Sequence, residues 1–456
     1  MSRIRRRTIT LAAVASLALG GCATSTPNAP GAAATTGVTS AAEEVAAGSG
    51  IWDATTLHDI SVEVDEEAYA AMIATYEESD EKEWIEATVT IDGEVVERAG
   101  LRLKGNSSLR SVDADAEPTE LPWLIRLDKF VDDQEVDGWT ELVVRSNASE
   151  TALNEALALD LLAEAGLASE HAIATSFSVN GADARLRLVV QHLDERWEEE
   201  NFSTPGLLYK AEAGGDWSWR GDNPDAYTDV FDQETGDDDL APLIDLLDFV
   251  NNSSDEEFAA ELPARLDVEA FARYLAFEEV VENFDDIDGP GNNAYLRYDA
   301  TTGGFTVVAW DHNLAFGTSM GRGGFPGGGF PEDGERPEGM PTDMPTDFPS
   351  DFPSDLPEGM PEGERPEGMP QGMPEGGPGG MRGGSNVLVE RFTAVEEWAD
   401  LVEQATTDLR EELYDSGYAE EVLDQWVTVL TEQAGDLVDA ATVEEEADAI
   451  RAVIAA

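Results

Sequence analysis

The stretch NFDDIDGPGNNAYLRYDATTGGFTVVAWDHNLAFG, residues 283–317, joins a carboxylate-rich loop to an expected β-hairpin. A Gly-Pro-Gly turn separates Asp288 from Asn293, and two strand-like runs lead on to Asp311. A hairpin brings the residue before its first strand close to the residue after its second strand, so Asn293 and Asp311 are expected at one end. Their oxygen atoms suit a hard cation such as Mg²⁺ or Mn²⁺. The stretch therefore predicts a metal site.

Around this stretch lies a chain of 456 residues, for which one or two domains are expected. It carries 96 Asp and Glu against 27 Lys and Arg, a formal net charge of −69. Such a surface repels polyanions, so nucleic acid is not expected as a partner. The acidity is typical of a strongly solvated surface, and diffuse binding of Mg²⁺ or Ca²⁺ is the alternative interpretation.

The N-terminus has the pattern of an export signal. Several arginines precede an apolar run at 8–19 that is too short to span a bilayer comfortably. The run leads into Leu-Gly-Gly-Cys, which resembles a bacterial lipoprotein signal, and Cys22 is the only cysteine. We expect a signal peptide at 1–22, a lipid on Cys22 and a flexible tether at 23–50. The protein would then be lipid-anchored on the extracytoplasmic face of the cell membrane. An ordinary secretory signal with an unrelated cysteine is the alternative.

The region 51–190 is expected to form an N-terminal α+β lobe, because strand patterns surround two helical ones. Asp92-Gly93 and Asn180-Gly181 are typical turns of β-hairpins. Strands are expected at 61–64, 87–91, 94–96, 101–104, 124–127, 142–145, 176–179 and 186–190, and helices at 66–76 and 151–165.

A C-terminal lobe is expected at 191–319, with helices between 239 and 281 followed by the hairpin described above. Residues 320–385 are rich in Pro, Gly and Met, and they repeat the heptapeptide ERPEGMP. This composition predicts a disordered insert, which would act as an interaction arm or a spacer or would be a tolerated insertion. Helices at 386–456 are expected to complete the C-terminal lobe.

The spacing of Asp288 and Asn293 equals that of the catalytic Asp and the metal-binding Asn in protein kinases. In kinases a second metal-binding Asp follows a short hairpin, as Asp311 does here. The His-Arg that precedes the kinase Asp and the Asp-Phe-Gly motif are absent. The spacing alone is weak in so acidic a chain, in which a solvated loop is the simpler interpretation.

Several stretches in order resemble the CotH kinase family. The matching stretches are RLKGNSS at 102–108, WLIRLDKF at 123–130, VRSN at 144–147, TALNEALA at 151–158, the run at 186–194, LLYK at 207–210, NFD at 283–285, NNAYL at 292–296 and WDHNLAFG at 310–317. The resemblance implies an atypical two-lobed, kinase-like fold. It also implies transfer of the γ-phosphate of ATP to Ser or Thr of exported proteins, with Mg²⁺ or Mn²⁺.

By these motifs, Asp311 and Asn293 would bind the metal, and Asn313 would add an oxygen ligand where many members have Asp. The catalytic carboxylate is open between two residues. Asp288 keeps the five-residue spacing to Asn293, whereas Asp285 keeps the Asn-x-Asp context, and Asp288 is preferred.

The nucleotide-binding cation is also open, because many family members have a Lys just before the strand at Trp123, where this chain has none. Arg126, Lys104 and Lys210 are the candidates, with Arg126 favoured by its place on that strand. Glu155, on the helix expected at 151–165, would pair with Arg126 as a helix Glu pairs with a strand Lys in kinases.

Two other classes of function stay open. One is a non-catalytic, acidic surface or adhesion lipoprotein, including a degenerate kinase. The other is a Ca²⁺-binding module that uses the acidic segments 237–239 and 285–288. The four histidines lack zinc spacing, and His312 is expected to be a half-exposed turn residue. A cation close to Asp311 would favour the kinase.

Overall fold

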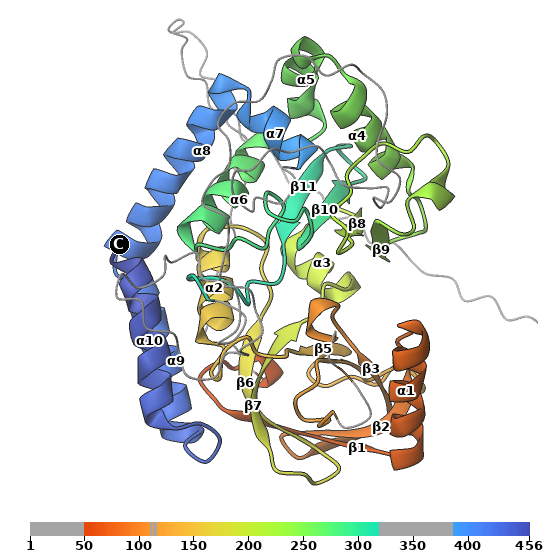
Figure 1. The fold of residues 1–456 in the computed structure, drawn as a ribbon, viewed down its shortest axis with the longest axis vertical. Coiled ribbons are helices and arrows are strands. Elements are labelled where there is room, and N and C mark those ends of the chain that lie inside the picture. Colours follow the sequence, from red (N-terminus) through yellow and green to blue (C-terminus); the bar gives the residue numbers. More distant parts are fainter. Residues whose placement is uncertain (1–49, 110–111, 113–115, 319–385) are drawn as a thin grey trace, which may run out of the picture. The chain divides into compact units, whose positions relative to one another are not determined.

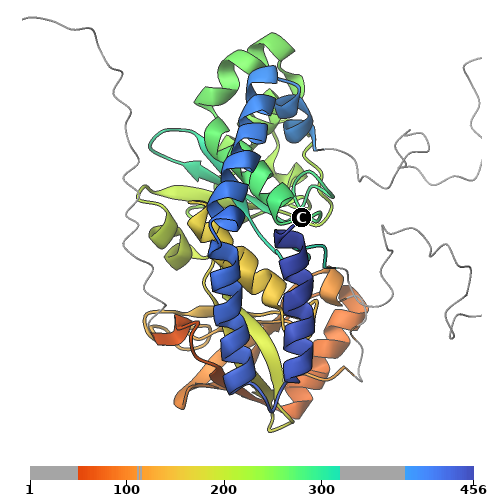
Figure 2. The same cartoon turned by 90° about the vertical axis from the view of Figure 1, so that its left-hand side faces the viewer.

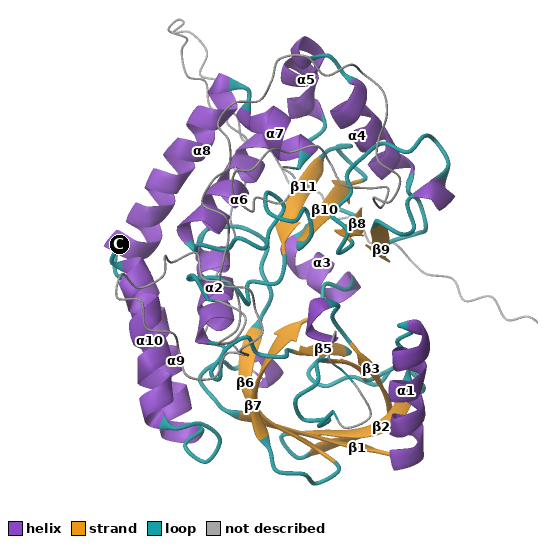
Figure 3. Cartoon of the chain, viewed as in Figure 1, coloured by secondary structure: helices purple, strands orange, loops and turns teal. Residues whose placement is uncertain are grey.

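The structure is a computed structural model that describes residues 50–109, 112, 116–318 and 386–456. The expected signal peptide with Cys22, the tether up to residue 49 and the insert at 320–385 lie outside the described residues. The chain is an α+β protein, as predicted, with a seven-stranded closed barrel and a separate four-stranded sheet. Figure 3 shows the strands in these two groups, with helices around them.

The barrel is built from the first half of the chain. Its strands are β1 (His58–Val64), β2 (Ile85–Ile91), β3 (Glu94–Leu103), β4 (Trp123–Arg126), β5 (Glu141–Val144), β6 (Ala172–Val179) and β7 (Arg185–Gln191). Their order is β1-β2-β3-β4-β5-β7-β6, and a parallel pairing of β1 with β6 closes the barrel. Alternate side chains fill its interior, including Ile60, Val89, Leu101, Ile125 and Leu142.

The β2–β3 hairpin confirms the Asp-Gly turn. Asp92 and Gly93 have φ values of 50° and 86°, which a two-residue turn between twisted strands requires. The strand expected at 101–104 is not separate. It is the end of the ten-residue strand β3, because a register shift between Ala87 and Val89 lets β3 continue along β2.

Two long helices accompany the barrel. Helix α1 (Glu66–Ser79) begins at Asp65, whose carboxylate accepts the N–H groups of Glu67 and Ala68. Helix α2 (Leu153–Glu164) has nine of its twelve residues buried, so both of its faces are covered. The short helix α3 (Glu195–Asn201) then leads from the barrel to the sheet.

The four-stranded sheet has the order β11-β10-β8-β9, with every neighbouring pair antiparallel. Its strands are β8 (Gly206–Ala211), β9 (Phe231–Thr235), β10 (Ala294–Asp299) and β11 (Phe305–Ala309), and the helices before the hairpin are α4 (Ala241–Asn252), α5 (Asp255–Glu261) and α6 (Val268–Val280). The predicted hairpin is confirmed. Ala294 pairs with Ala309, so the residues just before β10 and just after β11 lie at one end.

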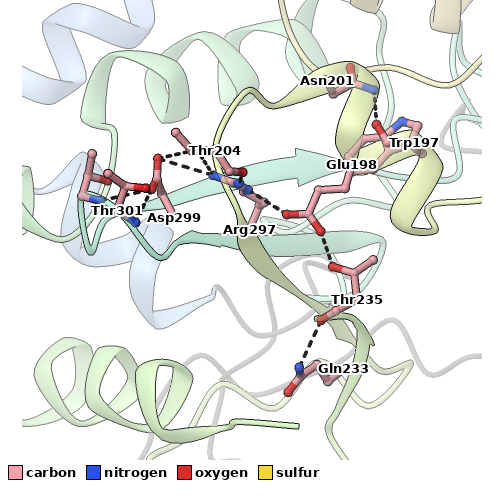
Figure 4. A network of polar contacts seen from close by, with 10 residues as sticks. Trp197, Glu198, Asn201, Thr204, Gln233, Thr235, Arg297, Asp299 and Thr301 are labelled. Carbon is pink, nitrogen blue, oxygen red and sulfur yellow. Dashed lines mark hydrogen bonds and ion pairs between the residues drawn. The ribbon is translucent and has the colours of Figure 1, made fainter. Parts of the chain in front are cut away.

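A buried ion pair ties α3 to the sheet (Figure 4). Arg297 on β10 and Glu198 on α3 lie 3.3 Å apart, and Thr235 on β9 donates to the other oxygen of Glu198. Arg297 also donates to the hydroxyl of Thr204. Breaking such a buried pair costs about 3–5 kcal/mol, so this network fixes the start of the sheet relative to α3.

The chain ends in helices, as predicted. They are α7 (Val387–Thr393), α8 (Glu396–Leu409), the π-helical segment η6 (Arg410–Asp415), α9 (Tyr418–Gln433) and α10 (Ala440–Ile454). They were expected to complete the C-terminal lobe, but their packing is divided: α8 lies along α6, whereas α9 and α10 lie against α2 (Figures 1 and 2).

Direct hydrogen bonds hold α2 and the residues just before it to the last two helices. The indole N–H of Trp426 donates to Asp160 Oδ2 at 2.7 Å, and the backbone N–H groups of Glu150 and Thr151 donate to Glu446 at 3.0 and 3.1 Å. Within the described ranges, no helix has the length and apolar character needed to cross a bilayer.

Candidate functional site

Two residues at the end of the β10–β11 hairpin have a left-handed backbone conformation. Asn293 has a φ of 52° and Asp311 a φ of 66°. Asn and Asp tolerate this conformation better than other residues with side chains, but it still costs about 1–3 kcal/mol at each position. Such backbone strain clusters at functional sites, and here it lies at the two positions that the sequence analysis selects as metal ligands.

Arg145 joins the barrel, α2 and the hairpin. It follows the buried strand β5, and its Nε and Nη2 lie 3.0 and 2.8 Å from the two carboxylate oxygens of Glu155 on α2. The same Nη2 contacts Asp311 Oδ1. Burial alone would lower the pKa of Arg145, but Asp311 and Glu155 outweigh it and raise that pKa. Arg145 is thus a charged bridge between two carboxylates.

The pairing expected between Arg126 and Glu155 is therefore wrong. Arg126 lies opposite Glu141 in the β4–β5 register, and its guanidinium is 3.1 Å from Glu141 and 2.8 Å from Asp128. The partner of Glu155 is Arg145, one residue beyond β5. Arg145 was not among the predicted site residues, although a cation directly after the apolar run at 142–144 is a signal that could have indicated it.

The loop before β10 brings Asp285 to the hairpin end. Asn293 Nδ2 donates to the backbone oxygen of Asp285 at 2.8 Å. Burial, together with the nearby charge of Asp311, raises the pKa of Asp285. Asp285, Asn293 and Asp311 thus form one group.

Asp288, the preferred catalytic carboxylate of the sequence analysis, lies on the exposed side of the same loop. Its backbone N–H donates to Asp286 Oδ1 at 3.1 Å, and so does that of Gly289 at 2.8 Å. Asp286 therefore shapes the turn that separates Asp288 from Asp285. The choice between Asp285 and Asp288 stays a prediction, but it is Asp285 that the fold brings to Asn293 and Asp311.

His312, which was expected to be half-exposed, is fully buried. Its Nε2 lies 3.3 Å from Glu278 on α6, and Glu278 also accepts a hydrogen bond from Asn283 at 2.9 Å. Burial would lower the pKa of His312, but Glu278 and other nearby carboxylates outweigh it and raise that pKa to about 9. This contact fixes the turn after Asp311 to α6 and to the loop that carries Asp285.

Asn313 is held by α2. Asn154 Nδ2 donates to the backbone oxygen of Asn313 at 2.5 Å. The side-chain Oδ1 atoms of both residues are buried with no hydrogen-bond partner among the described residues. Buried polar atoms are nearly always paired, so an oxygen left in this way beside Asp311 fits a role as a ligand.

Lys104, directly after β3, is a candidate cation that lies against Trp310, the residue before Asp311. Its Nζ is 5.7 Å from the centre of the Trp310 ring and 2.8 Å from His192 Nε2. Burial lowers the pKa of Lys104 to about 7, and the charge of Glu234 opposes this shift. Lys210 on β8 forms an ion pair with Glu212 at 3.1 Å and acts on Lys104 through its charge. Trp310 and His192 are site residues that the sequence analysis missed.

No group of three or more His, Cys, Asp or Glu side chains in the described part of the chain is arranged to hold a metal by itself. The donors near Arg145 are the carboxylates of Asp311 and Asp285 and the amides of Asn293 and Asn313. Mg²⁺ usually binds proteins through one or two carboxylates together with substrate phosphates. This set of donors therefore fits a divalent cation that arrives with a phosphorylated ligand.

Comparison with known proteins agrees with the resemblance seen in the sequence. The profile of the family described as "CotH kinase protein" matches residues 101–445. The "Inner spore coat protein H" of Bacillus subtilis (strain 168) is 24% identical over 170 residues, which cover 36% of this chain and 46% of that protein. The chain thus spans about half the length of this curated relative.

Proposed function

Since the chain belongs to the CotH kinase protein family, we propose that it transfers the γ-phosphate of ATP to Ser or Thr of exported proteins. In this proposal the barrel and the four-stranded sheet, each with its helices, correspond to the two lobes of a kinase-like fold. The observation that carries it is the buried ion pair of Arg145 with Glu155 on α2, next to the hairpin end that bears Asp311. Protein kinases require both a cation–Glu ion pair on the helix and a correctly placed Asp after the hairpin.

The proposal gives each side chain a role in phosphoryl transfer. Asp285 takes the proton of the substrate's Ser or Thr hydroxyl, while the oxygen of that hydroxyl attacks the γ-phosphorus. The bond from that phosphorus to the leaving oxygen of ADP breaks, and Lys104 contacts the phosphate oxygens. Mg²⁺ or Mn²⁺, held by Asp311 and Asn293 with Asn313 beside them, would neutralise phosphate charge when bound. Such catalysis is mostly positioning and charge stabilisation.

The cellular setting is part of the proposal. The sequence pattern at Cys22 supports a lipid anchor on the extracytoplasmic face of the membrane, where exported proteins are the available acceptors. Labelling cells with a fatty-acid analogue tests this point. The wild-type protein is expected to be labelled, and Cys22→Ser is expected to lose the label.

One observation favours a second function. The Oδ1 of Asp311, which a metal would need, already contacts Arg145, as expected if the site had lost catalysis. In that case the protein is an acidic surface lipoprotein that binds nucleotide, metal or neither, without phosphate transfer. A Ca²⁺-binding module would show stabilisation by Ca²⁺ and no effect of nucleotide.

Calorimetric titration of ATP into the full chain, with and without Mn²⁺ or Mg²⁺, separates these functions. We expect saturable binding that needs the metal and is lost in Asp311→Asn, a change that keeps the shape of the side chain. Phosphate incorporation into a Ser- and Thr-containing acceptor protein is then measured with the same two proteins. If folded wild-type protein does not bind ATP, the kinase proposal fails and the surface-protein function replaces it.

A further inference from the structure

A row of four polar side chains lies on the outer face of the barrel, from strands β3, β4, β5 and β7, and reaches Trp310. Arg126 on β4 lies 3.1 Å from Glu141 on β5, and Glu141 lies 2.7 Å from Nδ1 of His192, the residue after β7. Nε2 of His192 lies 2.8 Å from the Lys104 ammonium. The row runs from the partly exposed Arg126 at the end of β4 to the Trp310 ring, and Lys104 is its last member.

The two neighbours of His192 determine which of its nitrogens carries a proton. An ammonium can only donate, so Nε2, which contacts Lys104, is the acceptor, and the proton of the neutral ring is on Nδ1, on the side of Glu141. His192 is 5% exposed, and its burial together with the charge of Lys104 holds its pKa well below the ordinary value. The imidazole is therefore neutral, and it holds Lys104 without cancelling its charge.

This arrangement sets Lys104 apart from Arg145, Arg126 and Lys210. Arg145 is paired with Glu155 and Asp311, Arg126 with Asp128 and Glu141, and Lys210 with Glu212. Lys104 forms no ion pair with a carboxylate of the described residues, although Glu234 and Glu141 act on it from farther away. Its charge thus stays available for an anionic ligand beside Asp311.

We propose that His192 is a positioning residue for nucleotide binding, a neutral acceptor that aims the Lys104 ammonium at the phosphate groups of ATP. A carboxylate in its place would neutralise the ammonium, whereas an apolar residue would leave a partly desolvated cation without a hydrogen-bond acceptor. The inference rests on the proposed kinase function, because it assigns His192 a part in binding the nucleotide of that same site.

Two substitutions of similar polarity separate the two contacts of His192. In His192→Asn the amide occupies the place of Nδ1 beside Glu141, but nothing reaches Lys104. In His192→Gln the longer side chain puts its amide near the place of Nε2, where its oxygen can accept from Lys104. The Kd of ATP with Mg²⁺ is measured by calorimetry for the wild type and both variants, and KM and kcat are measured for phosphate transfer.

We expect His192→Asn to weaken ATP binding about tenfold, because a hydrogen bond to a charged group is lost. KM for ATP should rise by a similar factor and kcat should change less than about threefold, whereas His192→Gln should stay near the wild type. In the Lys104→Met background His192→Asn should have no further effect, because His192 acts only through Lys104.

Equal affinity of His192→Asn and the wild type would overturn the inference. The inference would also be overturned if adding His192→Asn to Lys104→Met weakened ATP binding by as much as His192→Asn does alone. Thermal unfolding of all variants shows whether each is folded. If His192→Asn is not folded, His192→Gln is used for the test. An unchanged Kd of His192→Gln for ATP supports the inference, and a tenfold loss of affinity overturns it. The wild-type titration alone tests the proposed kinase function. If folded wild-type protein does not bind ATP, both that function and this inference are overturned.

Discussion

Two cations lie against the same indole ring, and they are held in opposite ways. The guanidinium carbon of Arg145 is 5.6 Å from the centre of the Trp310 ring, and the ammonium of Lys104 is 5.7 Å from it. Arg145 lies between the carboxylates of Glu155 and Asp311, whereas Lys104 contacts a neutral imidazole. Distance to a site therefore does not tell which cation is available to a ligand.

The difference follows from the two side chains. A guanidinium has five N–H donors in a planar fork and can contact two carboxylates at once, so Arg145 connects β5, α2 and the turn after β11. An ammonium is a compact charge whose pKa falls readily on burial, as that of Lys104 does. We infer that Arg145 serves mainly the architecture of the site and Lys104 mainly binding.

The largest expected effect is on catalysis, at Asp285, the carboxylate that lies near Asp311. Loss of a catalytic base lowers rates by about 10²- to 10⁴-fold, and we expect Asp285→Asn to lower phosphate transfer by that factor. Asp288→Asn is the matched control on the same loop and should stay within about threefold of the wild type. Initial rates with radiolabelled ATP measure both. A large loss in Asp288→Asn with an active Asp285→Asn would restore Asp288, the carboxylate favoured by spacing.

Arg145→Met should reduce the stability of the fold more than any change at Lys104. It leaves Glu155, whose side chain is 4% exposed, without its cation, and breaking such a buried pair costs about 3–5 kcal/mol. Lys104→Met should alter the free energy of unfolding by less than about 1 kcal/mol, because it removes a partly desolvated charge. Urea unfolding at pH 7 compares the two variants. Equal losses would remove the distinction between the architectural and the binding cation.

For nucleotide affinity we expect Lys104 to matter more than Lys210, the other lysine near the site. We expect Lys104→Met to weaken ATP binding about 10- to 100-fold, as the loss of a charge-assisted contact to phosphate implies. Lys210→Met is the matched control, because Lys210 is already paired with Glu212, and it should change the Kd less than about threefold. Calorimetry with Mg²⁺ present gives both values. A larger loss of ATP affinity in Lys210→Met would indicate that Lys210 on β8, and not Lys104, contacts the phosphate groups.

The smallest expected effect is on pH dependence. Lys104 has a pKa lowered to about 7 by burial, with Lys210 and Arg102 adding to this shift and Glu234 and Glu141 opposing it. The ammonium is present below that pKa and is lost above it, so ATP affinity should fall several-fold as pH rises from about 6 to 8.5. Lys104→Arg keeps its charge and should lack this component. The titration of ATP itself is common to both proteins and cancels in their ratio.

Local patterns predicted the framework of the site. Asp92-Gly93 between two apolar runs is sufficient for a hairpin, and the runs on either side of 301–304 are sufficient for β10 and β11. The strained positions Asn293 and Asp311 follow from that hairpin. Short strands with polar centres, such as β9 with the sequence FDQET, carry no such pattern and were not expected.

The contacts that distinguish the cations could not be predicted in this way. Arg145 meets Asp311 across 166 residues, and Lys104 meets His192 across 88, so no window of sequence contains either pair. The Asp-x4-Asn spacing favoured Asp288 because counting residues ignores the turn that Asp286 forms. Which carboxylate faces Asp311 depends on that turn and on the burial of the loop, and both are properties of the folded chain.

The attachment of α2 to α9 and α10 has a consequence for biosynthesis. Thr151 and Glu446 are 295 residues apart, and Asp160 and Trp426 are 266 apart. At about 5–20 residues per second, a ribosome needs roughly 15–60 s to reach Glu446 after it has added Thr151. During that interval α2 lacks its outer anchors, so the Glu155–Arg145 bridge is not yet held in place. The contacts that anchor α2 on this side can therefore form only after the last helices have been synthesised.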